Sequence, residues 1–447
     1  MMKTIFLFMQ NDMFKKMLKK ILFYNKIYDI IKDSFLYQAW KKLNGQIANF
    51  LYGNPSKSFF VIGVTGTNGK TTTVNLIHKI LNDNLAKTMM ISTANIKVGN
   101  EELKNVKKMT SLDIYDLQST LAIAKDSGCK VAVLEVSSHG MDQARFEGTD
   151  FDCAVLTNIT HDHLDYHGTM DHYIEAKKRL FTYVLKNSKA NKYAVLPADD
   201  AVGRKWFEEL AFDKKVNFSI TWSSMLKAEK ITFLTWGTEF IFSYLGKSYT
   251  LKTHLVGKFN VLNILAAMGV ATNIGVSIEK AIASIEGFEG VEGRMEQIEK
   301  DGINYYIDFA HSPDSLEKTL EYLSSIKWAG RLIVTFWAPW VRDKTKRPEM
   351  GKIVAEYADI AIATDDDPDT ENRLEILQQL TSDMKNKTEW KNLFILPERS
   401  LAIKFATEIA KSGDVLMFAG KGHEAVQLTN FGKRKWSDKE EVLKNLK

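Results

Sequence analysis

Short apolar runs alternate with segments of helical periodicity along most of this chain. The run at 59–64 (FFVIGV) is rich in β-branched and aromatic residues and predicts a buried strand, as do the runs at 131–136 (VAVLEV) and 153–156 (CAVL). Apolar positions recur at helical spacing at 74, 77, 80 and 81, and segments 120–125 and 173–183 show the same spacing. Strands that alternate with helices indicate an α/β fold with a mostly parallel sheet.

Two changes of pattern divide the remainder of the chain. Residues 231–257 alternate apolar and polar positions, which predicts an antiparallel hairpin region within the first unit. After 290–294 (GVEGR) a second α/β unit is predicted from apolar runs at 305–308, 332–336, 360–364, 393–396 and 415–418. We therefore predict a short helical extension over residues 1–58, a central α/β domain over residues 59–293 and a C-terminal Rossmann-like α/β domain over residues 294–447.

The first 45 residues combine apolar positions at helical spacing with clustered lysines, Lys15, Lys16, Lys19 and Lys20 among them. A basic amphipathic helix of this kind can lie on an anionic membrane surface, at the inner face of the membrane. A helical hairpin that packs on the body with a solvated lysine face fits the same pattern, and both interpretations stay open. No stretch has the length and apolarity of a transmembrane helix, and no signal-peptide pattern follows the short apolar start.

Composition adds modest constraints. The chain has 45% hydrophobic and 26% charged residues, which is typical of a soluble globular protein. Its net charge of +5 is small for 447 residues, so we expect no nucleic-acid partner. Cys129 and Cys153 lie in apolar surroundings without metal-ligand spacing, which predicts reduced core thiols in a cytoplasmic protein.

The segment 65–73 (TGTNGKTTT) follows the first predicted strand and opens a helix. Gly66 and Gly69 allow a tight turn whose N–H groups point inward, and the helix N-terminus adds positive dipole. Lys70 supplies a charge for the β- and γ-phosphates, and the hydroxyl of Thr71 or Thr72 can ligate Mg²⁺. The sequence therefore predicts a nucleoside-triphosphate site and makes the central domain, residues 59–293, a P-loop ATPase domain, although position 64 is valine where the general motif has its first glycine.

Candidate metal ligands follow the next two predicted strands. Glu135 closes the run at 131–136, a position at which ATPases of this architecture hold Mg²⁺. The segment 157–181 places His161, Asp162, His163 and nearby acidic and imidazole groups behind the run at 153–156. Such groups suit a divalent metal next to phosphates. A polar loop with a helix cap is the alternative for any one of them.

Eight motifs occur in order from residue 66 onward: GTNGKTT, EVSSHGMDQARF, TNITHDHLDYHGTMDHYIEAKKRLF, LVGKFNVLNILAA, EGRMEQI, IDFAHSPDSLEK, RDKTKRPEMGKI and FAGKGHE. Taken together they resemble the Mur ligases, and within them the UDP-N-acetylmuramoyl-tripeptide synthetase branch. The resemblance covers the chain from about residue 45 to its end. It implies an ATP-dependent ligase that joins a carboxylate to an amine through an acyl phosphate, in cell-wall peptidoglycan synthesis.

The resemblance also implies roles for individual residues. It makes Lys70, Glu135, His163 and Lys177 catalytic, and assigns two Mg²⁺ ions to Thr71, Glu135, His163 and a carbamylated Lys177. It assigns ATP to Gly66, Thr67, Asn68, Gly69, Lys70, Thr71, Thr72, Asn260, Asn263, Arg294, Asp308 and His311. It assigns the muramoyl-peptide acceptor to Thr110, Ser111, Ser137, Gln143 and Arg145, and the incoming amino acid to Arg342, Asp367, Asp369, Gly420 and Glu424.

The chain departs from the family pattern in three places. Only about 45 residues precede the matching region, where family members carry a full domain that binds the uridine nucleotide. The amino-acid-selecting motif Asp-Asn-Pro-Arg reads DDPD at 366–369, so aspartate replaces the arginine that would pair with a distal carboxylate. Trp337 and Trp340 stand where the family has glycines.

From these departures we expect the substrate to be L-lysine or another basic amino acid, added to a UDP-MurNAc-dipeptide-like acceptor by a monomeric enzyme. Asp369 as a simple helix cap is the alternative to a selecting role. Two further hypotheses stay open. One is a Mur-type ligase with a folate-like, poly-glutamate or lipid-linked acceptor, and the other is a non-catalytic nucleotide-binding module.

Overall fold

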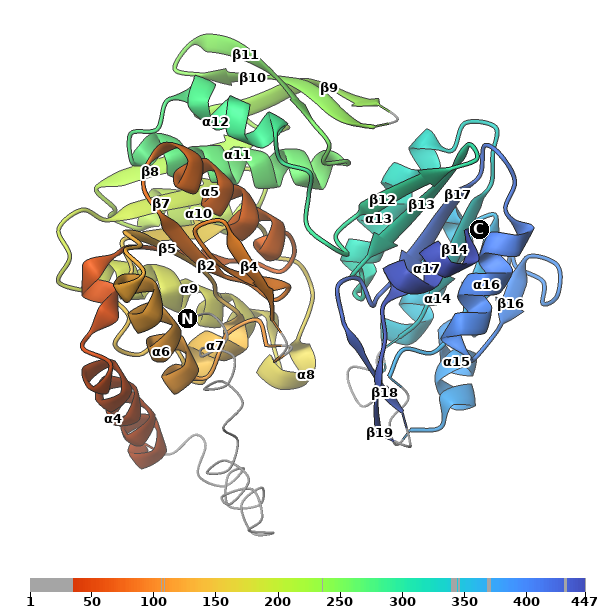
Figure 1. Ribbon diagram of the computed structural model, residues 1–447, viewed down its shortest axis with the longest axis horizontal. Helices are drawn as coiled ribbons and strands as arrows, with labels where there is room; N and C mark the ends of the chain where they lie inside the picture. The colour runs from red at the N-terminus through yellow and green to blue at the C-terminus, as the bar shows by residue number, and fades with distance from the viewer. Residues whose placement is uncertain are drawn as a thin grey trace.

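The computed structural model describes residues 35–447 except 106, 108, 235, 339–343, 345, 368–370, 430–431 and 447. The predicted basic helix of residues 1–34 lies outside the described residues. Two α/β units lie side by side, a central unit built on one sheet and a C-terminal unit built on another (Figure 1). The predicted fold class is confirmed, because both sheets are mostly parallel and carry helices on both faces.

The central unit is an 11-stranded sheet with the order β11-β10-β9-β8-β7-β6-β1-β5-β2-β3-β4. Its parallel strands are β1 (Phe60–Thr65), β2 (Thr88–Ile91), β5 (Val131–Glu135), β6 (Cys153–Leu156), β7 (Tyr193–Pro197) and β8 (Lys214–Ser219). At one edge β3 (Asn95–Val98) and β4 (Glu101–Lys104) are antiparallel. The predicted hairpin region is instead a three-stranded meander, β9 (Leu226–Leu234), β10 (Gly237–Tyr244) and β11 (Lys247–Thr253), which continues the same sheet at its other edge.

Helices cover both faces of this sheet. On one face α5 (Lys70–Asn84), α11 (Lys258–Asn273) and α12 (Ile278–Glu286) pack against side chains such as Ile62 and Val64. On the other face α6 (Ile114–Asp126), α9 (Met170–Lys186) and α10 (Ala201–Glu209) pack against Val61 and Leu134. Consecutive residues of β1 thus face two cores, which explains why the strand reads as a continuous apolar run.

The C-terminal unit is a six-stranded sheet with the order β12-β13-β17-β14-β15-β16. The five predicted strands are present as β13 (Ile303–Asp308), β14 (Leu332–Phe336), β15 (Ile360–Ala363), β16 (Leu393–Ile395) and β17 (Val415–Ala419), all parallel. One face carries α13 (Pro313–Ile326), α14 (Lys346–Tyr357) and α15 (Arg373–Thr381), and the other α16 (Arg399–Ile409) and α17 (Asp438–Asn445). The antiparallel edge strand β12 (Glu296–Lys300) and the hairpin β18 (Val426–Thr429) and β19 (Gly432–Lys435) were not predicted.

The helix α4 (Phe35–Leu51) precedes the central sheet and is followed by the short helix η1 (Pro55–Ser58). The buried residues of α4 are small or polar: Gly45, Ala48 and Asn49. Its outward face is apolar, with five exposed side chains: Trp40, Leu43, Ile47, Phe50 and Leu51. Among the described helices, none combines the length and apolarity needed to cross a membrane.

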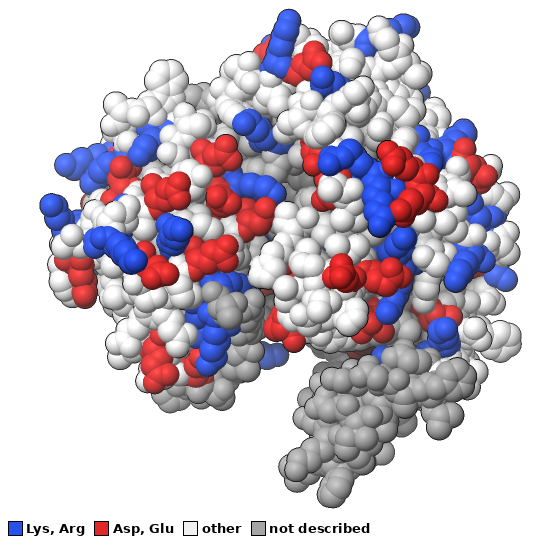
Figure 2. Space-filling model, turned by 180° about the vertical axis from the view of Figure 1, so that it is seen from behind, with Lys and Arg blue, Asp and Glu red and all other residues white. Residues whose placement is uncertain are grey.

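Charged side chains are distributed evenly on the face of the molecule seen in Figure 2. Lysine and arginine alternate there with aspartate and glutamate over both units, so that face shows no extended basic surface. The cysteine prediction is confirmed: Cys129 and Cys153 are both free and buried.

Candidate functional site

The phosphate-loop sequence forms the turn between β1 and α5. Gly66 and Gly69 have φ values of 147° and 83°, a region that favours glycine. A Cβ atom at Gly66 would lie 1.9 Å from Thr157 Oγ1, and one at Gly69 would lie 2.2 Å from Asn263 Oδ1. Both positions therefore require glycine for space as well as conformation. The resulting cradle has the backbone geometry that phosphate groups need.

Lys70 begins α5 and folds back over this loop. Its Nζ donates to the carbonyl oxygens of Gly66 and Thr67, at 3.0 and 2.8 Å. The side chain is half-buried, and its burial lowers the pKa of Lys70, while Glu135 and Asp162 act in the opposite direction. A phosphate group in the loop would supply the negative charge that this partly desolvated ammonium needs.

Glu135 lies beside the loop because β5 pairs with β1 in a register that sets Val64 opposite Glu135. Its carboxylate accepts hydrogen bonds from Thr71 Oγ1 at 3.0 Å, Thr93 N at 2.7 Å and Thr93 Oγ1 at 3.0 Å. The side chain is 3% exposed. Hydroxyl and carboxylate oxygens at the end of a phosphate loop are the ligand types that Mg²⁺ prefers, so the donor set fits a magnesium ion.

Lys177 lies on α9 and is 1% exposed, so a solvated helical lysine is excluded. Its Nζ donates to Gly66 O at 2.6 Å and lies 4.4 Å from the centroid of the Tyr173 ring. Burial is the main cause of a pKa well below the ordinary lysine value, and the nearby charge of Lys70 adds to it. Two lysines therefore converge on one carbonyl of the phosphate loop.

His163 stands before the short helix α8 (Leu164–His167) with φ at 56°. Its Nε2 is 3.5 Å from Asp162 Oδ2. Burial lowers the pKa of His163 to about 3, so the imidazole is neutral and can act as a ligand. Burial would raise the pKa of Asp162, but the nearby charges of His311 and Lys346 and the hydrogen bond from the backbone N–H of His163 outweigh it, so the pKa of Asp162 is lowered.

The other imidazole and acidic groups of this loop do not converge on the same point. His167 is buried and its Nε2 lies 3.0 Å from Ser138 Oγ on α7 (Ser138–Asp142), whereas His161 and Asp165 are exposed.

The C-terminal unit reaches the phosphate loop with two side chains. Arg294 Nη2 donates to Thr71 Oγ1 at 3.2 Å, and its guanidinium lies 4.5 Å from the centroid of the Phe309 ring. Asp314 Oδ2 accepts from Asn68 Nδ2 at 2.6 Å. The units therefore meet at the loop itself.

The remaining residues assigned to ATP have these positions. Asp308 is buried at the end of β13 and accepts from the backbone N–H groups of Met295 and Ala310. His311 is three residues further along, and its Nδ1 is 2.8 Å from Phe309 O. Asn260 and Asn263 are buried on α11, where Asn263 Oδ1 accepts from Thr73 Oγ1 at 3.3 Å behind the loop. Thr72 is buried in the first turn of α5.

The five residues assigned to the acceptor gather beyond the end of β5. Ser111 Oγ and Ser137 Oγ are 3.0 Å apart, and Arg145 Nη1 donates to Ser111 O at 2.7 Å. Gln143 Oε1 accepts from Arg145 Nε at 3.0 Å. Thr110 Oγ1 lies 3.0 Å from Thr93 Oγ1, which connects this group to Glu135.

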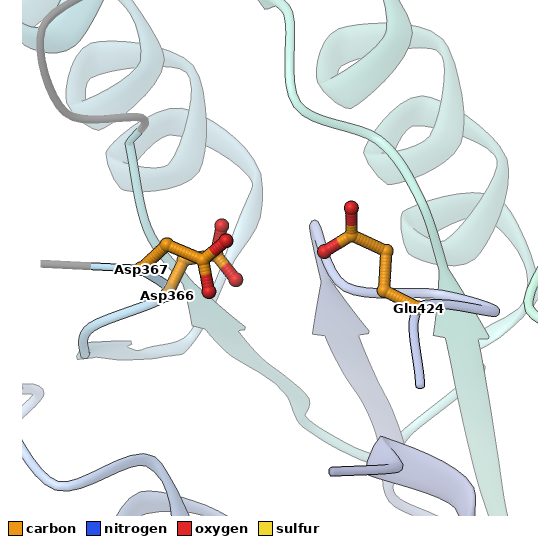
Figure 3. Close-up of side chains that lie close together, drawn as sticks. All are labelled: Asp366, Asp367 and Glu424. Atoms are coloured by element: carbon orange, nitrogen blue, oxygen red, sulfur yellow. The ribbon is translucent and has the colours of Figure 1, made fainter. Parts of the chain in front are cut away.

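A second charged cluster lies at the carboxyl edge of the C-terminal sheet. The carboxylates of Asp366, Asp367 and Glu424 face one another from two different loops (Figure 3). Lys421 is fully buried between them, with its Nζ 2.7 Å from Asp366, 2.7 Å from Asp367 and 2.8 Å from Glu424. One ammonium thus faces three carboxylates. Burial is the main reason that the pKa of Asp366 is raised to about 7, whereas the carboxylates raise the pKa of Lys421.

Gly420 immediately precedes this cluster, at φ of 101°. Arg342, Asp369 and Trp340 lie outside the described residues, so the structure says nothing about their side chains. Sequence reasoning did not find Lys421 or Asp366 as members of the cluster. Two signals could have found them: Lys421 follows a buried strand, where a lysine needs a partner, and Asp366 lies in the motif DDPD at 366–369.

Comparison with known families agrees with this geometry. Residues 64–271 match the model of the Mur ligase middle domain, and residues 293–422 match that of the Mur ligase glutamate ligase domain. The chain belongs to the Mur ligase family. Members of this family are ATP-dependent ligases that form peptide bonds and generally use Mg²⁺, so the predictions of family and enzyme class are confirmed.

Individual Mur ligases are similar over most of the chain. The UDP-N-acetylmuramoyl-L-alanyl-D-glutamate–2,6-diaminopimelate ligase of Halalkalibacterium halodurans is 39% identical over 89% of this chain and 79% of its own length. The ligase of the same name from Lactiplantibacillus plantarum is 36% identical over 96% of this chain and 86% of its own length. A solved structure of a ligase with this name is 32% identical, with a TM-score of 0.61 over 87% of this chain and 78% of that one.

A folylpolyglutamate synthase from Mycobacterium tuberculosis shares the fold, with a TM-score of 0.69 at 16% identity over 85% of this chain and 92% of that one. At this level of identity the likeness shows the fold alone.

Proposed function

We propose that this protein adds a basic amino acid, L-lysine in the first instance, to a UDP-MurNAc-dipeptide-like acceptor in peptidoglycan synthesis. The observation that carries the proposal is the cluster of three carboxylates around Lys421. It retains an excess of negative charge, and two of its carboxylates, Asp366 and Asp367, belong to the sequence motif in which Asp369 replaces the family's arginine. A substrate with a distal ammonium complements this charge, whereas a distal carboxylate would meet repulsion. The similar ligases are named for 2,6-diaminopimelate, which carries both a distal ammonium and a distal carboxylate, so the proposed preference for lysine concerns the distal carboxylate alone.

The first half-reaction takes place at the phosphate loop. The acceptor carboxylate attacks the γ-phosphorus of ATP, and the bond between this phosphorus and the β–γ bridging oxygen breaks. ADP departs as the leaving group, and the acceptor becomes an acyl phosphate. Phosphoryl transfer needs alignment and charge neutralisation more than covalent help. Lys70 supplies a positive charge from the loop, and Arg294 supplies one from the C-terminal unit. Thr71, Glu135 and His163 would hold Mg²⁺, which when bound adds further charge neutralisation.

The second half-reaction joins the two units. The amino group of the incoming amino acid attacks the acyl carbon, and phosphate leaves as the amide forms. Ser111, Ser137 and Arg145 would orient the acceptor next to Glu135. The carboxylates around Lys421 would orient the amino acid from the opposite side. Because Arg294 and Asp314 already touch the loop, closure of the units brings both substrates to one place.

Lys177 is the proposed site of carbamylation. A buried amine with a strongly lowered pKa is neutral, so it can attack CO₂ and form a carbamate with loss of one proton. The modification replaces a neutral amine near Gly66 with an anion. The carbamate would attract the Lys70 ammonium, and its oxygens would help hold Mg²⁺.

Contact with a membrane surface is supported by α4. Its outward face is apolar, and lysines cluster in the preceding segment of the sequence. Apolar burial combined with several lysines gives stronger attachment to anionic lipid than either alone. We expect the protein to co-sediment with anionic vesicles and less with neutral ones, and expect Phe50→Ser to weaken the binding. Equal sedimentation of the variant would show that α4 is not the contact.

The enzymatic proposal is tested by phosphate release and product mass. The protein is incubated with ATP, Mg²⁺ and UDP-MurNAc-L-Ala-D-Glu, with lysine, ornithine or diaminopimelate in turn. The expected product is the lysine adduct, formed faster than the diaminopimelate adduct. Preference for diaminopimelate would overturn the argument from the carboxylate cluster. No product with any amino acid, while ATP still binds, would overturn the choice of acceptor.

A further inference from the structure

Thr93 donates two of the three hydrogen bonds that the Glu135 carboxylate accepts from described residues. It follows β2 by two residues, and β2 pairs in parallel with β5, which ends at Glu135. Thr93 N donates to Glu135 Oε2 at 2.7 Å, and Thr93 Oγ1 donates to Glu135 Oε1 at 3.0 Å. The third hydrogen bond comes from Thr71 Oγ1, which donates to Oε2 at 3.0 Å. Thr93 therefore fixes both carboxylate oxygens, whereas Thr71 contacts one.

The turn that contains Thr93 is held in place from two directions. Within the turn, Ser92 N donates to Asn95 O at 2.9 Å, and Asn95 N donates to Ser92 Oγ at 3.1 Å. The side chain of Asn95 also exchanges two hydrogen bonds with the side chain of Asn75 on α5, at 3.1 and 3.2 Å. Because α5 begins next to Thr71, the turn and the end of the phosphate loop share one support.

The same turn holds the segment that leads to the residues assigned to the acceptor. Asn105 Nδ2 donates to Ser92 O at 2.8 Å and to Met109 O at 3.0 Å. Met109 immediately precedes Thr110, whose Oγ1 lies 3.0 Å from Thr93 Oγ1. Thr93 is therefore connected to the acceptor residues on one side and to the buried carboxylate on the other.

The direction of these hydrogen bonds follows from the chemistry of the groups. A carboxylate only accepts, and a hydroxyl has one proton to donate. The Thr93 proton is therefore donated to Glu135, and the Thr110 hydroxyl donates to Thr93 Oγ1. Thr110 is half-buried, so its oxygen keeps lone pairs for an N–H or O–H group of a ligand. Loss of the hydroxyl at position 93 would release Glu135 and Thr110 at once.

We propose that Thr93 is a positioning residue for the ligase reaction, because it orients Glu135 toward Mg²⁺ and Thr110 toward the acceptor. The inference rests on the proposed function, which takes Thr71 and Glu135 as Mg²⁺ ligands and places the acceptor next to Glu135. A group that hydrogen-bonds a metal ligand fixes the orientation of that ligand, and its loss typically weakens metal binding by about 10–100-fold. One threonine thus sets the metal-binding carboxylate in register with the acceptor.

The test compares Thr93→Val, which keeps the shape and removes the hydroxyl, with Thr272→Val. The control makes the same change on another half-buried threonine, whose Oγ1 donates only to Gly269 O of its own helix, at 3.2 Å. In Thr93→Val the Mg²⁺ concentration for half-maximal rate is expected to rise about tenfold or more. KM for the acceptor is expected to rise about threefold or more, and KM for lysine to stay within about twofold, because lysine is proposed to bind the other unit. Thr93→Ser, which keeps the hydroxyl, and Thr272→Val should match wild type.

Melting temperature measures the metal dependence without turnover. A non-hydrolysable ATP analogue should raise it with increasing Mg²⁺, and the Mg²⁺ concentration at the midpoint of this rise should be about tenfold higher for Thr93→Val. An unchanged midpoint would overturn the inference and leave the proposed function standing. An unchanged KM for the acceptor would overturn the link through Thr110. A wild-type protein that couples no amino acid would overturn the proposed function, whereas a shifted midpoint in Thr93→Val would still support the orientation of Glu135 by Thr93.

Discussion

Lys421 should be among the least replaceable side chains of the C-terminal unit. Its Nζ contacts three carboxylates at 2.7, 2.7 and 2.8 Å and donates to Val426 O at 3.0 Å. Replacement by methionine keeps the volume and leaves three acidic groups buried together. Removing one partner of a buried ion pair costs about 3–5 kcal/mol. For a unit of this size each kcal/mol corresponds to about 2–4 °C, so the unfolding temperature should fall by about 6–20 °C.

The stability lost in Lys421→Met should depend on pH. The pKa of Asp366 is raised to about 7 from an unfolded value of 3.8, so its ionisation destabilises the folded state as pH rises from about 4 to 7. Lys421 opposes this by lowering the pKa of Asp366. In Lys421→Met the protonated form is favoured further, so the difference from wild type should be smaller at pH 5.5 than at pH 8.5.

Urea unfolding followed by circular dichroism at the two pH values measures both effects. The control is Lys391→Met, an exposed lysine for which the structure shows no side-chain ion pair. The reasoning is refuted if Lys421→Met loses less than about 1 kcal/mol at pH 8.5, the level of a surface pair. It is also refuted if the loss is the same at both pH values.

Three further predictions concern Glu135, Arg347 and the two cysteines. Glu135→Gln should lower kcat by about 100-fold or more, because the carboxylate charge beside Thr71 is lost. The far-ultraviolet circular dichroism spectrum should stay unchanged, and a fall in kcat of less than about tenfold would exclude a central role. Arg347→Met should destabilise the C-terminal unit by about 3–5 kcal/mol in urea, since Arg347 is fully buried and holds Glu371 at 3.0 and 2.9 Å; a change within the error of the wild-type measurement would contradict this. Burial raises the pKa of both Cys129 and Cys153, so a thiol reagent at pH 8 should modify neither in the native protein and both in urea; rapid native reaction of either would show that the packing around it is wrong.

Most strands that the sequence predicted are buried on both faces, although the predicted edge strand β16 is only partly buried and the buried strands β2 and β7 were missed. β1, β5 and β14 read as continuous apolar runs because consecutive side chains enter two different cores. β12 and β19 were missed because they lie at edges and carry polar sequences, EQIEK and GKRK. Such strands form through pairing with a neighbour, and their own sequence contains no burial signal.

The residues of the candidate site also divide into those that local sequence predicts and those that only the folded chain brings together. The phosphate loop was predictable because its glycines, Lys70 and Thr71 are adjacent in sequence and act through local backbone geometry. The ion pairs of Lys421 with Asp366 and Asp367 were not predictable from local pattern, since these aspartates are more than fifty residues away and meet Lys421 only through the order of β17, β14 and β15. Glu135 was found from its position at a strand end, a rule that combines local pattern with topology.

The departures from the family pattern that fall on described residues share one location. Trp337 and Asp367 both follow strands of the C-terminal sheet at its carboxyl edge, next to Gly420. The other neighbour of β17 in that sheet is β13, which ends at Asp308. Asp314, a few residues further along, accepts a hydrogen bond from Asn68 of the phosphate loop. The sheet therefore fixes the distance between the edge proposed to bind the amino acid and Asp308, on the side of this unit that meets the phosphate loop. Side chains at that edge can differ without displacing Asp308, because the strands between them are rigid and buried.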